Sequence, residues 1–105
     1  MSDANAAPLV PPHDLQAEMG VLGSMLLSQD AAYIARERLA EASFYKLAHQ
    51  DVFRAILALA DSHGAVDLIL LCDELEREGR LEKAGGRDYL LELMEAVPTS
   101  ANVEY

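Results

Sequence analysis

The sequence predicts an all-α fold, a compact orthogonal bundle of five to six helices with a disordered N-terminal tail. Apolar residues recur at intervals of three and four along several segments, which is the spacing of amphipathic helices. Only the run VDLILL is typical of a strand, and it is short and followed by strong helix formers. The chain has 105 residues, of which 51% are hydrophobic and 25% charged, and this composition suits one globular domain.

The two ends of the chain are predicted to lie outside the bundle. Residues 1–12 are expected to form a disordered tail that ends at a pair of prolines. Residues 13–98 form the predicted helical domain. Residues 99–105 are typical of the first turn of a following helix, the start of a truncated element. Because one turn does not sustain a helix by itself, we expect this last segment to be frayed.

The first helix is expected over DLQAEMGVLGSMLL, with Asp14 as its N-terminal cap. Gly20 and Gly23 lie inside it, where each glycine costs about 1 kcal/mol relative to alanine. We interpret them either as places where a neighbouring helix or chain approaches closely or as merely tolerated residues. A second, shorter helix is predicted through AAYIARERLA, with Asp30 as its cap.

Three further helices complete the predicted bundle. The third follows SFYKL and ends at Gly64. The fourth spans VDLILLCDELEREG, with Asp67 as its cap and Gly79 as its end. The fifth is expected over residues 87–97. Two ion pairs are expected on the exposed face of the fourth helix, Asp73 with Arg77 and Glu76 with Arg80.

The apolar faces of these helices predict a single core. Leu91 falls outside the apolar stripe of the fifth helix and indicates a second contact surface. The predicted core residues are Leu15, Met19, Leu22, Leu26, Phe44, Val52, Phe53, Ile56, Leu71, Leu75, Leu90 and Leu93.

No motif in the sequence predicts catalysis or cofactor binding. A phosphate-binding loop would need G-x-x-x-x-G-K-[ST], and no stretch matches it. No histidine stands at metal-ligand spacing from another histidine or cysteine. We interpret His49 as a packed histidine whose ring nitrogen bonds the backbone or a helix cap, and Cys72 as a buried structural thiol. We therefore assign no catalytic, cofactor-binding or metal-binding residue.

The formal net charge of −10, from 8 basic and 18 acidic residues, bears on possible partners. It argues against strong DNA binding, since affinity for phosphates comes mainly from lysine and arginine. It also disfavours anionic membranes, and no apolar run approaches the ~20 residues that span a bilayer. The charge would attract a basic protein partner or simply keep the protein soluble. The single cysteine excludes an internal disulfide and fits a reducing cytosol.

Four strings in fixed order carry a resemblance to a known family: PPHDLQAEMGVLGSMLL, SFYKLAHQDVFRAI, VDLILLCDELEREGRLEKAGGRDYL and VPTSANVEY. Together they resemble the N-terminal domain of the bacterial replicative DNA helicase, the DnaB family. The resemblance covers about residues 11–105. The sequence departs from the family pattern at Leu70, where a threonine is usual, and at Ser43, where an acidic residue is usual.

The resemblance implies a non-catalytic collar domain. In the family this domain is followed by a linker and a RecA-like ATPase domain that forms a hexameric ring around DNA. The N-terminal domains pair into a collar that receives the C-terminal region of primase. The full-length protein is therefore expected to be a cytoplasmic, ATP-dependent 5′–3′ DNA helicase of the bacterial replisome. ATP and Mg²⁺ are expected in the helicase domain and no cofactor in this fragment.

The partners implied by the resemblance are primase and other helicase protomers, with a helicase loader as a further candidate. The candidate interface residues are Gln16, Tyr89 and Leu91. Gln16 and Tyr89 match parts of the family's primase-facing surface, and Tyr89 combines an apolar ring with a polar tip. Both also have ordinary interpretations, as a solvated first-turn residue and a half-buried core tyrosine.

Three alternatives stay open at this point: a stand-alone helical DNA-binding domain, a related replication docking module such as the helical end of primase, and a small enzyme. The net charge counts against the first and the missing motifs against the last. In the family, the helix after PTSANVEY belongs to a helical hairpin that pairs protomers. We therefore expect the chain to be a fragment that stops where this hairpin begins, and to be mainly monomeric.

Overall fold

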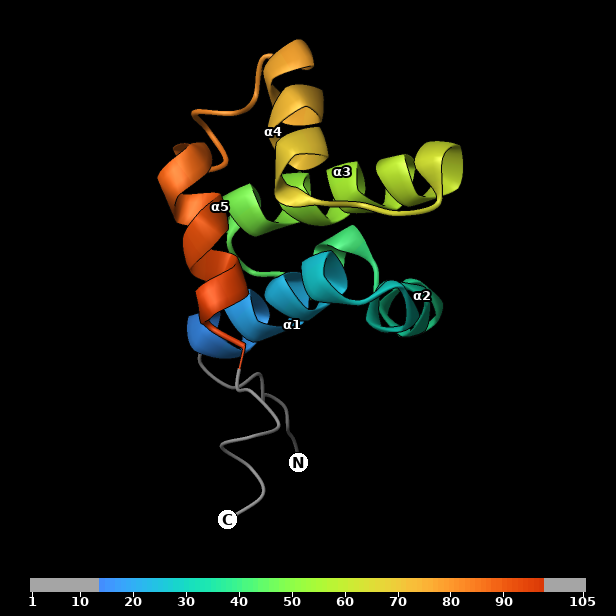
Figure 1. Cartoon of the computed structure of the whole chain (residues 1–105). Helices are drawn as coiled ribbons and strands as arrows, with labels where there is room; N and C mark the ends of the chain where they lie inside the picture. Colours follow the sequence, from blue (N-terminus) through green and yellow to red (C-terminus); the bar gives the residue numbers. More distant parts are fainter. Residues whose placement is uncertain (1–13, 98–105) are drawn as a thin grey trace.

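The computed structural model describes residues 14–97, in which all regular secondary structure is helical and no strand is present. This confirms the all-α class (Figure 1). The predicted tail, residues 1–12, and the predicted turn, residues 99–105, lie outside the described residues. The elements in order are α1 (Leu15–Leu27), α2 (Gln29–Arg38), the short 3₁₀ helix η1 (Glu41–Ser43), α3 (Leu47–His63), α4 (Leu68–Arg77) and α5 (Gly86–Glu95).

Helix α1 holds the bundle together, because it packs against α2, α3 and α5. In Figure 1, α5 and α2 lie at opposite ends of α1. Helix α3 packs in turn against α4, and the two are bent by 110° relative to each other. No single helix within residues 14–97 is long and apolar enough to cross a membrane, although α3 and α4 together meet the length and composition test.

Local capping explains where the helices begin. The carboxylate of Asp14 accepts a hydrogen bond from the Ala17 amide at 3.0 Å, and that of Asp67 accepts one from the Leu70 amide at 2.8 Å. Both predicted caps are therefore confirmed. The predicted cap of α2 is wrong, because the hydroxyl of Ser28 caps this helix instead.

The difference at α2 has a physical reason. Ser28 is the residue between α1 and α2, and its extended backbone (φ −147°, ψ 125°) aims its side chain at the first amides of α2. Asp30 then falls inside the first turn, where its carboxylate complements the positive helix end. Gly64 ends α3 as expected, with φ of 79°. The fifth helix covers Gly86–Glu95, starting and ending earlier than predicted.

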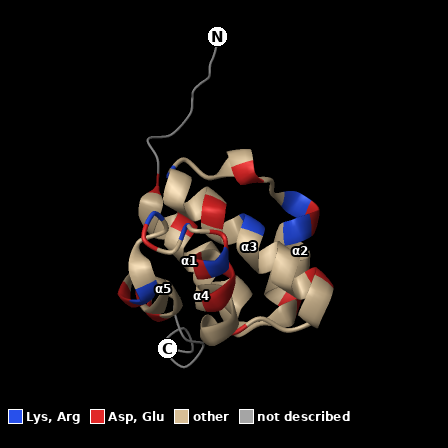
Figure 2. Cartoon of the chain, turned by 90° about the horizontal axis from the view of Figure 1, so that it is seen from above, with Lys and Arg blue, Asp and Glu red and all other residues tan. Residues whose placement is uncertain are grey.

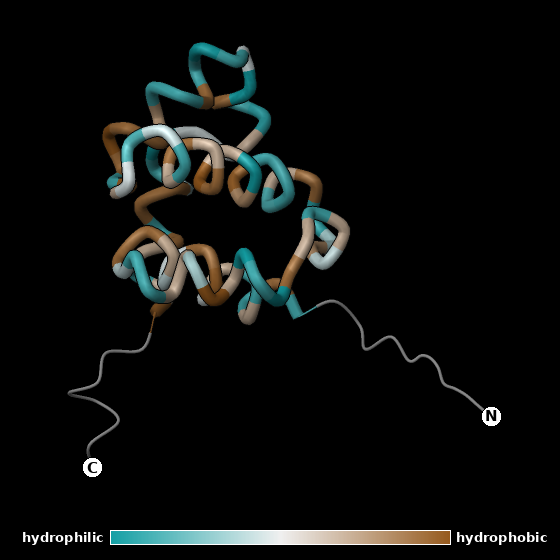
Figure 3. Tube along the Cα trace, turned by 90° about the vertical axis from the view of Figure 1, so that its right-hand side faces the viewer, coloured by the Kyte–Doolittle hydropathy of each residue, from teal (hydrophilic) through white to brown (hydrophobic). Residues whose placement is uncertain are grey.

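The core fills the space between the helices. Figure 3 shows hydrophobic and hydrophilic stretches mixed along the helical part of the chain, which is typical of amphipathic helices. Leu15 is 39% exposed, so its assignment to the core is wrong; it is the first residue of α1 and lies at the helix end. Met19 is partly buried and packs against the core. The other ten predicted core residues are buried: Leu22, Leu26, Phe44, Val52, Phe53, Ile56, Leu71, Leu75, Leu90 and Leu93.

The core also contains small residues that the apolar stripes do not reveal. Ala55 and Ala84 are both 0% exposed, and Ala84 lies in the turn between α4 and α5. Ala32 and Ala35 bury the face of α2 that meets the core. Alanine is common on buried and exposed helix faces alike, so its position alone does not predict burial.

The surface ion pairs of α4 differ from those predicted. Arg77 pairs with Glu74, three residues before it, where Asp73 was the expected partner. Arg80 pairs with Asp51 of α3 at 3.2 Å, where Glu76 was expected. The chain turns away after α4 ends, so Arg80 is no longer on a helix and reaches α3 instead. Such exposed pairs contribute little to stability, typically about 0–1 kcal/mol each.

Candidate functional site

A buried polar cluster joins α1, α3 and α5. The side chain of His49, in α3, is 0% exposed. Its Nδ1 atom lies 2.7 Å from Oε1 of Glu18 in α1, and its Nε2 atom lies 2.7 Å from the hydroxyl of Tyr89 in α5. Lys46 completes the cluster, with Nζ 3.4 Å from the same hydroxyl. One imidazole thus bridges three helices that are distant in sequence.

The carboxylate of Glu18 assigns one proton of the His49 ring. An ionised carboxylate can only accept, so Nδ1 of His49 carries the hydrogen and donates it to Glu18. Nε2 and the Tyr89 hydroxyl form the second bond of the ring, and which of the two donates depends on whether Nε2 carries a hydrogen. The Tyr89 oxygen in turn accepts from the ammonium of Lys46. Each of the four side chains in this cluster thus has a hydrogen-bond partner, as a buried network requires.

The carboxyl of Glu18 is held in its ionised form. Burial by itself would raise its pKa, but hydrogen bonds to the carboxylate outweigh this and lower the pKa from its usual value. The donors are the backbone amide of Tyr45 at 2.8 Å, the ring of His49, and the backbone amide of Lys46 at 3.5 Å. Glu18 therefore fixes the start of α3 against α1.

The Tyr89 ring is held on several sides. Its plane is nearly parallel to that of His49, with an interplanar angle of 11° and ring centroids 5.9 Å apart. The Lys46 ammonium lies 4.5 Å from the Tyr89 ring centroid, within cation–π range. Gly85 precedes α5 with φ of 109°, and a Cβ atom there would lie 2.7 Å from the Tyr89 side chain. A glycine at this position thus leaves room for the ring and supplies the left-handed backbone.

The cluster is built for positioning rather than for reaction. Both ring nitrogens of His49 are already bonded and the ring has no exposed surface, so a substrate cannot reach it. Within the described part of the chain, no three His, Cys, Asp or Glu side chains converge in a way that could hold a metal ion. Cys72 is 2% exposed, and burial raises the pKa of its thiol, which agrees with a buried structural role.

The three predicted interface residues differ in their surroundings. Tyr89 is half-buried and its hydroxyl is bonded within the domain, to His49 and Lys46. Leu91, two residues later in α5, is 43% exposed, and residues two apart on a helix do not share a face. Gln16 is exposed in the first turn of α1.

Sequence reasoning missed the cluster that binds Tyr89. His49 was predicted to bond the backbone or a cap, which is wrong, because both of its ring nitrogens bond side chains. Glu18 and Tyr89 lie 31 and 40 residues away from His49, so no local spacing connects them. The only signal was a histidine on an apolar helix face, which must find polar partners when buried.

Helices α1 and α5 approach each other closely at Gly23. A Cβ atom there would lie 2.0 Å from the carbonyl oxygen of Leu93 and 2.6 Å from Val97 Cγ2. This glycine therefore permits close helix packing inside the domain, one of the two interpretations offered above. It is covered by α5 and is not available to another chain. A Cβ atom at Gly20 would have no neighbouring atom within 4 Å, so Gly20 is the tolerated glycine.

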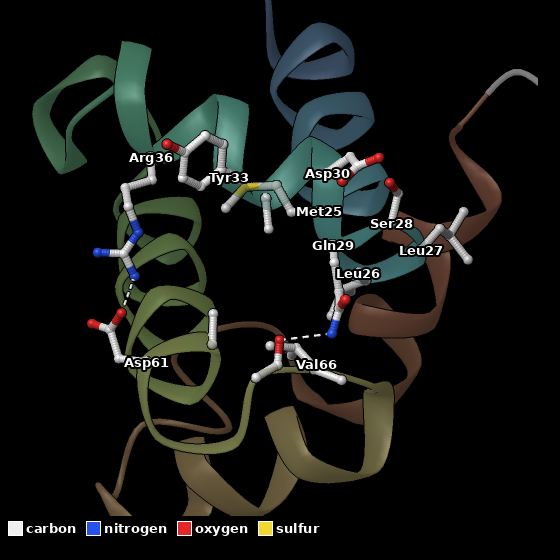
Figure 4. Close-up of a pocket in the computed structure, with 14 residues that line it drawn as sticks. Met25, Leu26, Leu27, Ser28, Gln29, Asp30, Tyr33, Arg36, Asp61 and Val66 are labelled. Carbon is white, nitrogen blue, oxygen red and sulfur yellow. Dashed lines mark hydrogen bonds and ion pairs between the residues drawn. The ribbon is translucent and has the colours of Figure 1, made fainter.

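A cavity of about 660 Å³ lies at the other end of α1, between α2 and the end of α3 (Figure 4). Met25 and Val66 line it from opposite sides. An ion pair between Arg36 and Asp61 borders it on one side. Gln29 borders it on the other, where its Nε2 donates to the Gly64 carbonyl at 2.8 Å. These contacts connect α2 to the end of α3 and the loop after it.

Within residues 14–97, the basic residues do not gather into one large patch. Figure 2 shows the acidic residues spread over several helices and the basic residues divided among several segments, with Arg36 and Arg38 together on α2. Four of the eight lysines and arginines lie in ion pairs within residues 14–97, namely Arg36, Arg54, Arg77 and Arg80.

The model of the DnaB-like helicase N terminal domain family matches residues 10–105, nearly the whole chain. The chain belongs to this family. The resemblance inferred from the four sequence strings is therefore confirmed.

Relatives and a solved structure agree with this membership. The replicative DNA helicase DnaB of Geobacillus stearothermophilus is 46% identical over 96 residues, covering 91% of this chain and 21% of that protein. DnaB of Mycobacterium leprae is 47% identical over 95 residues, covering 90% of this chain and 16% of that protein. The N-terminal domain of DnaB helicase from Mycobacterium tuberculosis is 47% identical, with a TM-score of 0.81 over 90% of this chain and 69% of that chain. The chain thus spans at most 21% of the length of these two relatives.

Proposed function

We propose that this chain is the non-catalytic collar domain of a hexameric replicative DNA helicase, and that it pairs protomers and docks primase during DNA replication. The observation that carries the proposal is membership of the DnaB N-terminal domain family, at 46–47% identity to replicative helicases over nearly the whole chain. The domain's own chemistry supports a binding role, because its most elaborate polar cluster positions side chains around a fully buried His49 ring.

The docking surface is proposed where α1, α3 and α5 meet. Gln16 and Tyr89 belong to the first turns of α1 and α5, and the cluster around His49 fixes those two helix ends against α3. A surface held by three helices loses little conformational freedom on binding, which favours affinity. Leu91, which is 43% exposed in α5, is proposed as a further contact residue.

Catalysis is proposed to reside elsewhere in the full-length protein. The full-length protein is an ATP-dependent 5′–3′ DNA helicase in this proposal, and ATP and Mg²⁺ bind its RecA-like domain. The present sequence has no phosphate-binding loop, and its net charge of −10 disfavours the DNA backbone. The proposed location is the bacterial cytoplasm, at the replisome, and a helicase loader is a further candidate partner.

Calorimetric titration tests the proposal. The 105-residue chain is titrated with the C-terminal region of primase from the same organism, and in parallel with duplex DNA at physiological salt. We expect saturable binding of the primase region and no measurable binding of DNA. Binding of DNA alone, with a steep loss of affinity as salt rises, would instead support the DNA-binding alternative.

Protomer pairing is tested by sedimentation. We propose that pairing depends mainly on the helical hairpin that follows this domain in the family. The 105-residue chain should then sediment mainly as a monomer at micromolar concentration, and a chain extended through the next two helices as a dimer. A tight dimer of the short chain, unchanged by the extension, would assign pairing to the surface of the domain itself.

A further inference from the structure

Lys46 differs from the other basic residues of this acidic chain. Its ammonium is held by the Tyr89 hydroxyl at 3.4 Å and lies 4.5 Å from the centroid of the Tyr89 ring. Yet no carboxylate of residues 14–97 lies within ion-pair distance of it. Lys46 is therefore a cation whose position is fixed but whose charge no ion pair within those residues neutralises.

The backbone around Lys46 is fixed as well. Its amide donates to Glu18 Oε1 at 3.5 Å, and the preceding amide donates to Oε2 of the same carboxylate at 2.8 Å. Glu18 is itself bonded to His49, whose other nitrogen bonds Tyr89. The buried cluster thus holds Lys46 at its backbone and at its side-chain tip. A lysine positioned in this way has already lost much of the freedom that it would otherwise lose on binding.

Two exposed apolar residues belong to the helix starts that the cluster joins. Leu47, the residue after Lys46, is 74% exposed at the start of α3. Leu15 is 39% exposed and lies one turn before Glu18 on the same face of α1. An apolar contact next to a fixed charge is the arrangement that protein interfaces use, with the apolar residues excluding water around the polar contact.

We propose that Lys46 is the docking cation of the primase-binding surface, pairing with a carboxylate of the docked protein while Leu47 and Leu15 make the adjoining apolar contacts. This inference rests on the function proposed above. Tyr89 is then a positioning residue: its hydroxyl is already bonded to His49 and Lys46, and it acts on the partner through the ammonium that it holds.

The overall charge of the chain agrees with this arrangement. A net charge of −10 attracts a partner that is basic overall, and this long-range attraction speeds association. Few cations are available to pair with a carboxylate of such a partner, because four of the eight lysines and arginines already form ion pairs within the domain. The pair at Lys46 therefore sets the orientation of docking more than its strength.

The test compares two lysines. Lys46→Met removes the charge but keeps the length of the side chain, and Lys83→Met makes the same change in the exposed turn after α4. Affinity for the C-terminal region of primase from the same organism is measured by calorimetry at two salt concentrations. Lys46→Met should weaken binding about fivefold and make it less sensitive to salt, and Lys83→Met should bind like the wild type.

A second measurement uses the wild-type protein and so does not depend on how a variant folds. Lysines are acetylated with acetic anhydride, with and without the primase region. Acetylation of Lys46 should fall at least threefold in the complex, relative to Lys83, if the ammonium is paired and covered.

The outcomes separate the two proposals. If the wild type binds the primase region, and Lys46→Met binds equally well with Lys46 still accessible to acetylation, this inference is overturned and the proposed function stands. If the wild type does not bind at all, the proposed function is overturned and this inference with it. Loss of binding in both methionine variants alike would also overturn it, because the effect would then be general electrostatics.

Discussion

Nε2 of His49 lies 2.7 Å from the hydroxyl oxygen of Tyr89, and the two rings are nearly parallel. This contact joins α3 to α5 across 40 residues of sequence. The other ring nitrogen binds Glu18 of α1, so one buried imidazole connects three helices. Removing any of its partners leaves a polar atom without a hydrogen bond in an environment that water does not reach.

The first prediction concerns this hydroxyl. Tyr89→Phe keeps the ring but leaves Nε2 of His49 without a hydrogen-bond partner, so it should destabilise the domain by about 1–3 kcal/mol. Tyr33→Phe is the matched control, because Tyr33 is 65% exposed, and it should change stability by less than about 0.5 kcal/mol. Urea unfolding followed by circular dichroism measures both. Equal midpoints for the two variants would show that the hydroxyl of Tyr89 is not part of a buried network.

The second prediction compares the two glycines of α1. Gly23→Ala would place a methyl group against the α5 backbone, so it should destabilise by at least about 1–3 kcal/mol. Gly20→Ala meets open space and should stabilise the helix by about 0.5–1 kcal/mol. Thermal unfolding of the two variants should therefore shift in opposite directions. A stabilising Gly23→Ala would mean that α1 and α5 do not approach each other closely at this residue.

The third prediction concerns the core. Leu22 is 0% exposed in the middle of α1, and its truncation to alanine should cost about 2–5 kcal/mol. Leu27, in the same helix, is 55% exposed, so Leu27→Ala should cost far less. A domain of this size has a total stability of about 5–15 kcal/mol, so Leu22→Ala should clearly lower the thermal midpoint. A shift of only a degree or two would contradict the helix register.

The fourth prediction follows from the lowered pKa of Glu18. Its folded pKa lies below its usual value of 4.5, so the ionised carboxylate stabilises the fold above about pH 4.5. This contribution is lost as the pH falls through the lower, folded pKa. The free energy of unfolding of the wild type should therefore drop more steeply with acidification than that of Glu18→Gln. At neutral pH, Glu18→Gln should be less stable than the wild type. Glu37→Gln, an exposed change in α2, is the control and should follow the wild type.

Parallel unfolding curves for wild type and Glu18→Gln between pH 7 and pH 3 would contradict the fourth prediction. They would mean that the bonds to Tyr45, Lys46 and His49 do not favour the ionised carboxylate over the protonated one.

The sequence predicts those features of this fold that depend on nearby residues. Asp14 and Asp67 cap the helices that directly follow them, so their roles appear in three or four residues of sequence. Asp30 shows the limit of this reasoning, because Ser28 lies two residues earlier and takes the cap that either could supply. Buried leucines are found by helical periodicity, whereas Leu15 shares that periodicity but lies beyond the end of the packed core.

The candidate site depends on contacts that no local pattern reveals. Tyr89 was identified through the family resemblance, but its bond to His49 depends on how α3 and α5 cross. The position of Lys46 depends on that same crossing, because the Tyr89 ring is what holds its ammonium. Gly23 could be predicted only in part. A glycine destabilises a helix, so its presence there indicates a close approach by another segment, but only the structure shows that this segment is α5.

The central claim is that the surface where α1, α3 and α5 meet docks primase. Titrating the ¹⁵N-labelled chain with the C-terminal region of primase from the same organism, and following amide chemical shifts, tests it most directly. We predict shifts concentrated at the first turns of α1 and α3 and at Tyr89, with α2 and the cavity beside it unchanged. Shifts confined to the α2 end, or none at saturating primase, would contradict the claim.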